Sequence, residues 1–199
     1  MNVAAIVLSA GASLRMGQPK ALMNMKGKTF LQQIIDVLSA TKISEIHIVL
    51  GSSAEQIRAT LVQFRGKIIY NAHWQEGQLS SIIVAINSLD VHSVDAMMLC
   101  LVDHPLIAEK TVNELLFSFA MSRKKIIVPT YCGQRGHPVI FSRDLFSEIK
   151  NALAKNGARS VLQKFPNEIC EVPTTDAGIV ANIDTIQDYE RYIFTKEND

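Results

Sequence analysis

The sequence opens with the stretch VAAIVLSAGASLRMGQPK, which runs from Val3 to Lys20. Its first part, Val3 to Leu8, is a continuous apolar run, the pattern of a buried parallel strand. A loop of small residues with two cations, Arg15 and Lys20, follows directly. Because α/β proteins bind ligands at the carboxyl ends of their strands, this order predicts a phosphate-binding loop at the edge of a sheet.

The residue types in this loop suit a triphosphate. Small residues let backbone N–H groups approach an anion closely, Arg15 can hold two phosphate oxygens at once, and Lys20 adds a compact charge. The loop is not a Walker loop, because Lys20 follows Pro19 and precedes Ala21, and the third glycine of the dinucleotide fingerprint is absent. A Gly/Ser loop with two solvated cations remains the alternative. We expect nucleotide contacts from Ser9, Ala10, Gly11, Ser13, Arg15 and Lys20, with Arg15 and Lys20 also catalytic.

The composition indicates one domain, 1–199, with a substantial core: the chain has 199 residues, of which 48% are apolar and 20% charged. A formal net charge of +1 argues against a broad nucleic-acid surface. Cys100, Cys132 and Cys170 show no CxxC spacing, which favours reduced thiols over disulfides or a zinc site. No apolar run is long enough to span a membrane, and the N-terminus starts directly as a strand. We therefore expect a cytoplasmic protein that acts on small molecules, without a nucleic-acid or membrane partner.

Strand-like and helix-like stretches alternate along the chain. This alternation predicts an α/β fold with a mostly parallel, doubly wound sheet in three αβα layers. A last helix is expected after Thr185, which can cap it. The expected strands are 3–8, 46–50, 67–70, 96–102 and 126–129, and the expected helices are 29–41, 54–64, 79–89, 109–121 and 142–155.

One carboxylate, Asp103, stands where the strand at 96–102 ends. If this strand neighbours the first one, Asp103 faces the phosphate loop. Magnesium prefers oxygen ligands and usually takes one or two protein carboxylates together with phosphate oxygens. We therefore expect Asp103 to be catalytic and to bind Mg2+, with an Asp that starts a turn before Pro105 as the alternative.

The pattern AGxSxRMGxxK, which spans 10–20, resembles the signature of the nucleotidyltransferases that attach a nucleotide to molybdopterin. Within that group the chain resembles most the molybdenum cofactor cytidylyltransferases. The resemblance covers nearly the whole chain and implies a Rossmann-like sheet of the nucleotide-diphospho-sugar transferase type, more variable near 130–172. It implies transfer of CMP from CTP to molybdopterin with release of pyrophosphate, and a molybdenum enzyme as recipient of the product.

The same resemblance suggests metal ligands. Asp103 and Pro105 match the family's Asp-x-Pro motif, whose Asp binds magnesium, although His104 stands where glutamine is commoner. The segment 183–189 resembles Ile-Asp-Thr-Pro-Glu-Asp-Tyr, which implies that Asp184 completes the metal site. Judged without the family, Asp184 could equally be a cap of the following helix.

Further segments resemble the nucleotide and acceptor sides of the family's site. Gly77, Ser80 and Ser81 lie where the family has a Gly-x-Ser-Ser segment that lines the nucleotide pocket, although helix capping by Ser80 explains part of the pattern. His137, in the segment GHPVIF, and Arg159, in Gly-Ala-Arg, match acceptor-side positions. The alternatives are an ordinary satisfied imidazole and a solvated arginine at a helix end.

The base and the acceptor remain open at this stage. Guanylyl relatives carry glycine where this chain has Ala10, and a methyl group there narrows the space beside the base, which favours a pyrimidine. The alternatives are a guanylyl- or sugar-phosphate nucleotidyltransferase and, in a different class, a non-catalytic molybdenum cofactor carrier.

Overall fold

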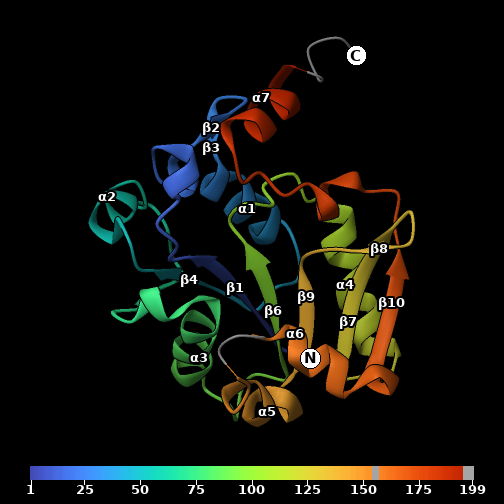
Figure 1. Cartoon of the computed structure of the whole chain (residues 1–199). Helices are drawn as coiled ribbons and strands as arrows, with labels where there is room; N and C mark the ends of the chain where they lie inside the picture. Colours follow the sequence, from blue (N-terminus) through green and yellow to red (C-terminus); the bar gives the residue numbers. More distant parts are fainter. Residues whose placement is uncertain (154–156, 195–199) are drawn as a thin grey trace.

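The computed structural model describes residues 1–153 and 157–194 (Figure 1). Its main sheet has eight strands in the order β10-β7-β9-β6-β1-β4-β5, with β8 paired to β7, and a small hairpin is formed by β2 and β3. The strands are β1 (Val3–Ser9), β2 (Asn24–Met25), β3 (Lys28–Thr29), β4 (Glu45–Leu50), β5 (Lys67–Tyr70), β6 (Ala96–Leu101), β7 (Ile126–Tyr131), β8 (Gln134–Arg135), β9 (Val139–Ser142) and β10 (Ile169–Pro173). The α-helices are α1 (Phe30–Ser39), α2 (Ala54–Ala59), α3 (Gln78–Ser88), α4 (Glu109–Met121), α5 (Phe146–Lys150), α6 (Arg159–Lys164) and α7 (Ile186–Phe194).

The sheet is mostly parallel and is wound in two directions from its first strand. β1 pairs in parallel with β4 on one side and with β6 on the other, and β4 pairs in parallel with β5. β9 runs antiparallel to both β6 and β7, while β10 is parallel to β7. The loops after β1 and β6 therefore leave the same edge of the sheet, as the doubly wound pattern predicts.

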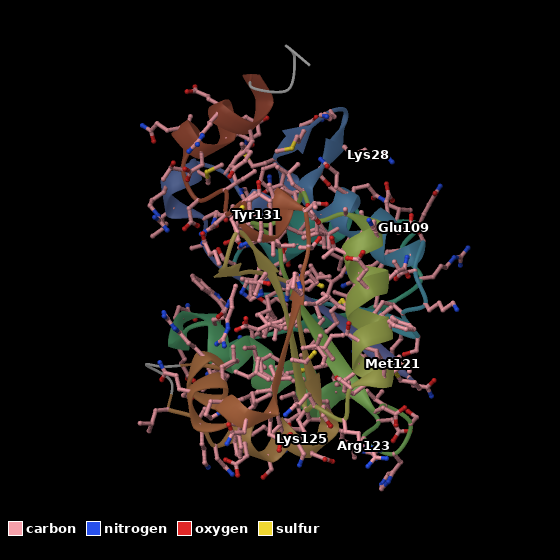
Figure 2. All side chains as sticks on the ribbon, turned by 90° about the vertical axis from the view of Figure 1, so that its right-hand side faces the viewer. Lys28, Glu109, Met121, Arg123, Lys125 and Tyr131 are labelled. Atoms are coloured by element: carbon pink, nitrogen blue, oxygen red, sulfur yellow. The ribbon has the colours of Figure 1, made fainter. Side chains whose placement is uncertain are left out.

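Helices cover both faces of the sheet, which gives the three expected layers. Alternate residues of β1 face opposite layers: Ile6 belongs to a buried cluster with Ile82 of α3, and Val7 to one with Ile34 of α1. Residues of α5 and α6 join the first cluster, and those of α2 and α4 the second. Figure 2 shows α4 running beside the sheet from Glu109 to Met121.

The structure confirms the five expected strands, but the helices expected over 54–64 and 142–155 are shorter than predicted. Helix α2 ends at Ala59 instead of residue 64, where the Thr60 hydroxyl donates to the Ile57 carbonyl and a turn follows. The prediction of one helix over 142–155 was wrong: Ser142 caps a short 3₁₀ turn, α5 ends at Lys150, and residues 154 and 155 lie outside the described residues.

The sequence interpretation did not include the hairpin of β2 and β3 or the late strands β8, β9 and β10. Among the helices that the structure describes, none combines the length and the apolar character needed to cross a membrane.

Candidate active site

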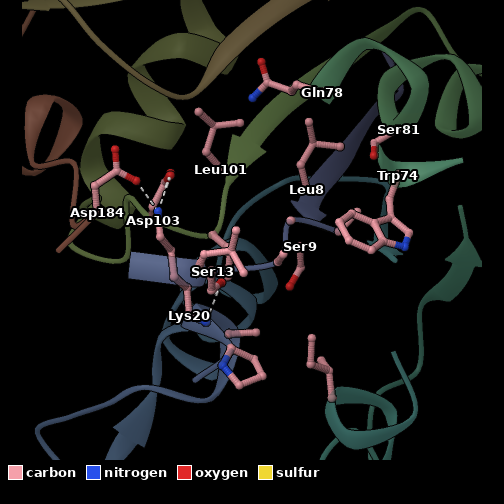
Figure 3. Close-up of a pocket in the computed structure, with 18 of the residues that line it drawn as sticks. Leu8, Ser9, Ser13, Lys20, Trp74, Gln78, Ser81, Leu101, Asp103 and Asp184 are labelled. Atoms are coloured by element: carbon pink, nitrogen blue, oxygen red, sulfur yellow. Dashed lines mark hydrogen bonds and ion pairs between the residues drawn. The ribbon is translucent and has the colours of Figure 1, made fainter. Parts of the chain in front are cut away.

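A pocket of about 460 Å³ lies at the carboxyl ends of β1 and β6. The strand order reverses between these two strands, because β4 and β5 follow on one side of β1 and β6 lies on the other. This is the place where doubly wound sheets bind their ligands. The loop after β1 forms one wall and floor, the start of α3 forms another wall, and two carboxylates lie at one end (Figure 3). Of the expected nucleotide-binding residues, the lining includes Ser9, Ala10, Gly11, Ser13, Arg15, Lys20, Gly77 and Ser81.

The loop after β1 is folded back on itself by two residues in the left-handed region. Ser13 has φ 52° and Gly17 has φ 69°, and a short 3₁₀ turn lies between them. The Ser13 hydroxyl accepts a hydrogen bond from the backbone N–H of Lys20 at 3.0 Å. This bond closes the loop, so that the Lys20 side chain points across the pocket (Figure 3).

The Lys20 ammonium group joins the two carboxylates of the pocket. Its Nζ lies 3.1 Å from Oδ2 of Asp103 and also forms an ion pair with Oδ1 of Asp184. The Arg15 guanidinium lies 3.2 Å from Oδ2 of Asp184, although most of the Arg15 side chain is exposed. Four charged residues, which the sequence interpretation had singled out separately, therefore meet at one point.

Asp184 is brought beside Asp103 by the segment that precedes α7. The backbone N–H of Ile183 donates to the Asp103 carbonyl at 2.9 Å, and the Ile183 side chain is fully buried. Gly178 lies directly on Leu106: a Cβ atom at Gly178 would stand only 2.0 Å from the Leu106 carbonyl oxygen. Two chain segments more than seventy residues apart are thus held in close contact behind the carboxylates.

The alternative of Asp184 as a helix cap is resolved by the contacts at the start of α7. The Thr185 hydroxyl accepts from the backbone N–H of Asp188, and the Asp188 carboxylate in turn accepts from the backbone N–H of Thr185. This is a reciprocal capping box. The Asp184 side chain is left to face Lys20 and Arg15.

The two carboxylates are suited to a divalent metal. Burial alone raises the pKa of Asp103, but the hydrogen bond from His104 and the charge of Lys20 outweigh it and hold the pKa at about 2. The pKa of Asp184 is also lowered, mainly by Lys20 against the opposing effect of burial. Residues 1–153 and 157–194 contain no group of three or more His, Cys, Asp or Glu side chains that could hold a metal. Two ionised carboxylates beside a phosphate loop nevertheless match magnesium, which takes its remaining ligands from phosphate and water.

The opposite side of the pocket is built by α3 and the residues before it. Figure 3 shows Trp74 and Ser81 across the pocket from Asp184. The buried amide of Asn71 donates to the hydroxyls of both Ser80 and Ser81. Ser80 also donates to the Gly77 carbonyl, so its hydroxyl is used within the helix start, and Ser80 is not among the lining residues.

The two expected acceptor residues lie outside the pocket lining. Arg159 is exposed at the first position of α6. The His137 ring packs against His104, with ring centroids 5.2 Å apart, and its buried Nδ1 has no hydrogen-bond partner. Contact of either residue with an acceptor remains a prediction.

His104 is a site residue that the sequence interpretation did not select. Its Nδ1 lies 3.0 Å from Oδ1 of Asp103, and the residue is 8% exposed. The available signal was its position directly after Asp103, but adjacent residues often point in different directions. Trp74, the one tryptophan of the sequence, also lines the pocket.

A parallel α/β sheet with an Arg/Lys loop and two carboxylates at its switch point defines a nucleotidyltransferase-type fold and site. Comparison with protein families agrees: residues 5–169 match the MobA-like NTP transferase domain. The chain belongs to this family.

The chain is also similar to curated relatives and to solved structures. The chain is 28% identical to nicotine blue oxidoreductase of Paenarthrobacter nicotinovorans, over 96% of each chain. It is 28% identical to a probable molybdenum cofactor guanylyltransferase of Bacillus cytotoxicus, over 57% of this chain and 55% of that one. Rv0371c of Mycobacterium tuberculosis H37Rv has the same fold, with a TM-score of 0.85 and 24% identity over 98% of this chain and 99% of that one. Rv0371c was also solved in complex with manganese, and that structure gives a TM-score of 0.81 and 23% identity over 98% and 100% of the two chains.

Proposed function

We propose that this protein transfers CMP from CTP to the terminal phosphate of molybdopterin and releases pyrophosphate. The observation that carries the proposal is the convergence of Arg15, Lys20, Asp103 and Asp184 at one end of the pocket. Family membership supports nucleotidyl transfer, and the guanylyltransferase relative supports an acceptor of the molybdopterin type.

In the proposed reaction, a phosphate oxygen of molybdopterin attacks the α-phosphorus of CTP, and the bond from that phosphorus to the bridging oxygen of the β-phosphate breaks. Negative charge develops on the departing pyrophosphate. Arg15 and Lys20 would bind and stabilise it, since both cations lie in the loop beside the pocket. Asp103 and Asp184 would hold Mg2+, which supplies positive charge to the phosphates when it is bound.

The cytidine part of CTP would lie on the side of the pocket opposite the carboxylates of Asp103 and Asp184. Trp74, Gly77 and Ser81 line that side, and the buried Asn71 fixes the Ser81 hydroxyl from behind. The proposed preference for cytosine over guanine rests on Ala10, which lines the pocket and whose methyl group would narrow the space beside the base. Ser9, Gly11 and Ser13 would contribute loop contacts to the triphosphate.

The test is incubation of the protein with Mg2+, purified molybdopterin and each nucleoside triphosphate in turn, followed by mass analysis of the pterin product. The expected product is the CMP adduct. A GMP adduct would replace the cytidylyl assignment but keep nucleotidyl transfer. A nucleotide adduct formed only when a sugar phosphate is supplied in place of molybdopterin would replace the acceptor. Binding of molybdopterin without pyrophosphate release would indicate a carrier.

A relative named an oxidoreductase covers nearly the whole chain, so the same preparation should be assayed for reduction of a dye by reduced nicotinamide nucleotides. We expect no such activity above the background of a reaction without protein. Reduction without any pterin adduct would contradict the proposed function.

A further inference from the structure

His104 is placed to control the direction of the Asp103 carboxylate. Its imidazole Nδ1 lies 3.0 Å from Oδ1, whereas Lys20 contacts the other oxygen, Oδ2, at 3.1 Å. The two contacts lie on different carboxylate oxygens, so together they fix the rotation of the carboxylate about its Cβ–Cγ bond. His104 thus holds Oδ1, and Oδ2 is the oxygen that contacts Lys20, which also pairs with Asp184.

The His104 ring is itself held on its other side. It is 8% exposed and packs on the His137 ring, with centroids 5.2 Å apart and planes tilted by 59°. His137 is anchored through its backbone N–H, which donates to the Ile179 carbonyl at 2.9 Å. Ile179 is fully buried, so the two packed imidazoles are attached to a firmly held part of the backbone.

We infer that His104 is a positioning residue that orients Asp103 for metal binding, with His137 as its packing support. The inference rests on the proposed function, since it takes Asp103 as a metal ligand. Groups that hydrogen-bond a ligating carboxylate fix its orientation, and their loss commonly weakens metal binding 10- to 100-fold. His104 touches neither nucleotide nor acceptor in this account, so its effect should fall on the metal and not on the triphosphate.

Two kinds of substitution separate hydrogen bonding from packing. In His104→Asn the amide Nδ2 is bonded to Cγ as the imidazole Nδ1 is, so a donor to Asp103 is kept. In His104→Phe the ring that packs on His137 is kept, but the donor is lost. His104→Leu provides a second variant without a donor, should the larger Phe ring prevent folding.

The experiment is a titration of each purified variant with Mn2+ alone, followed by electron paramagnetic resonance, together with calorimetric binding of CTP without metal. We expect His104→Phe and His104→Leu to bind Mn2+ about 10-fold or more weakly than the parent, and His104→Asn to stay within about threefold of it. Affinity for CTP should be unchanged in all three. In steady state, the apparent KM for Mn2+ should rise in the donor-less variants while the KM for CTP stays constant.

The Asp103→Asn variant separates a failure of the proposed metal site from a failure of the proposed role of His104. If it binds Mn2+ as the parent does, the metal site itself is wrong and the proposed function loses its support. If Asp103→Asn abolishes Mn2+ binding while His104→Phe and His104→Leu bind Mn2+ like the parent, the positioning role of His104 is overturned and the metal site stands. Equal weakening of Mn2+ and CTP binding in every His104 variant, Asn included, would also overturn it, because that pattern reflects general structural damage.

Discussion

The Lys20 ammonium group lies 3.1 Å from Oδ2 of Asp103 and bridges it to Asp184, so the two proposed metal ligands share one cation of the same chain. Lys20 is also the residue that we expect to bind the triphosphate. These two roles cannot be filled at once in the same position. In the proposed reaction the two ligands would therefore be coupled: an arriving triphosphate would attract Lys20, and Asp103 and Asp184 would then be able to hold a metal.

Lys20→Met is expected to change the affinities for the two ligands in opposite directions. Loss of a charge-assisted bond should weaken CTP binding about 10-fold or more, while removal of the competing cation should strengthen binding of Mn2+ alone by about 10-fold. Calorimetry and paramagnetic resonance measure the two affinities. Lys28→Met is the matched control, because Lys28 pairs with Asp36 at the surface and does not line the pocket. Weaker binding of both ligands to Lys20→Met would refute the competition.

Asp184→Asn is expected to lower turnover about 100-fold while the melting temperature changes little, because its carboxylate faces Lys20 and Arg15 and not the helix end. Asp188→Asn is the matched control. It removes the carboxylate of the capping box, so it should lower stability by about 1 kcal/mol and leave turnover largely intact. A thermal shift with normal activity in Asp184→Asn would show that this residue has only a structural role.

His137 is expected to make the folded state sensitive to mild acid. Burial, with a smaller contribution from the neighbouring His104, lowers the pKa of His137 from its ordinary value of 6.5 to about 4. The unfolded chain therefore binds a proton before the folded one, and stability present above pH 6.5 is lost as the pH falls from 6.5 towards 4. The loss is up to about 3 kcal/mol.

Urea unfolding of the parent and of His137→Asn between pH 7 and 4.5 measures this effect. The variant should show a smaller decrease in the free energy of unfolding than the parent, and His92→Asn, at an exposed position, should follow the parent. Identical pH dependence in the parent and His137→Asn would show that His137 is not held neutral by the fold.

Ala10→Gly is expected to relax the choice of base. Ala10 is 6% exposed and lines the pocket, and its carbonyl accepts a hydrogen bond from the Ser52 N–H, which fixes its position. Removing one methyl group from a packed pocket changes specificity by roughly 10- to 200-fold. The ratio of kcat/KM for CTP to that for GTP should fall at least about 10-fold. An unchanged ratio would place the choice of base elsewhere in the pocket.

The central part of the fold was predictable because its signals are local. An apolar run such as Val3 to Leu8 marks a buried strand by itself, and the alternation with helices sets a parallel sheet. The short strand β9 was not predicted, since its pairing with both β6 and β7 depends on residues far away in sequence. The same holds for β10 at the edge of the sheet.

The candidate site, like the fold, could be predicted from the sequence only in part. The loop from Ser9 to Lys20 can be identified from its residue types, but nothing local shows that Lys20 pairs with Asp184, 164 positions later. The sequence predicted Thr185 as a cap of α7, but it did not show that Asp188 completes the capping box and that the Asp184 side chain faces the pocket. The direction of the His104 ring depends on its packing with His137, which only the folded chain establishes.

The measurement that tests the central claim most directly is the stoichiometry of a single turnover. Parent protein and Asp103→Asn are mixed with Mg2+, CTP and molybdopterin, and pyrophosphate and the pterin product are quantified together. The account predicts that the parent forms one CMP adduct of molybdopterin for each pyrophosphate released, and that Asp103→Asn, folded as the parent is, forms both orders of magnitude more slowly. Absence of pyrophosphate and adduct from the parent with every nucleoside triphosphate, or equal rates in the parent and Asp103→Asn, would contradict it.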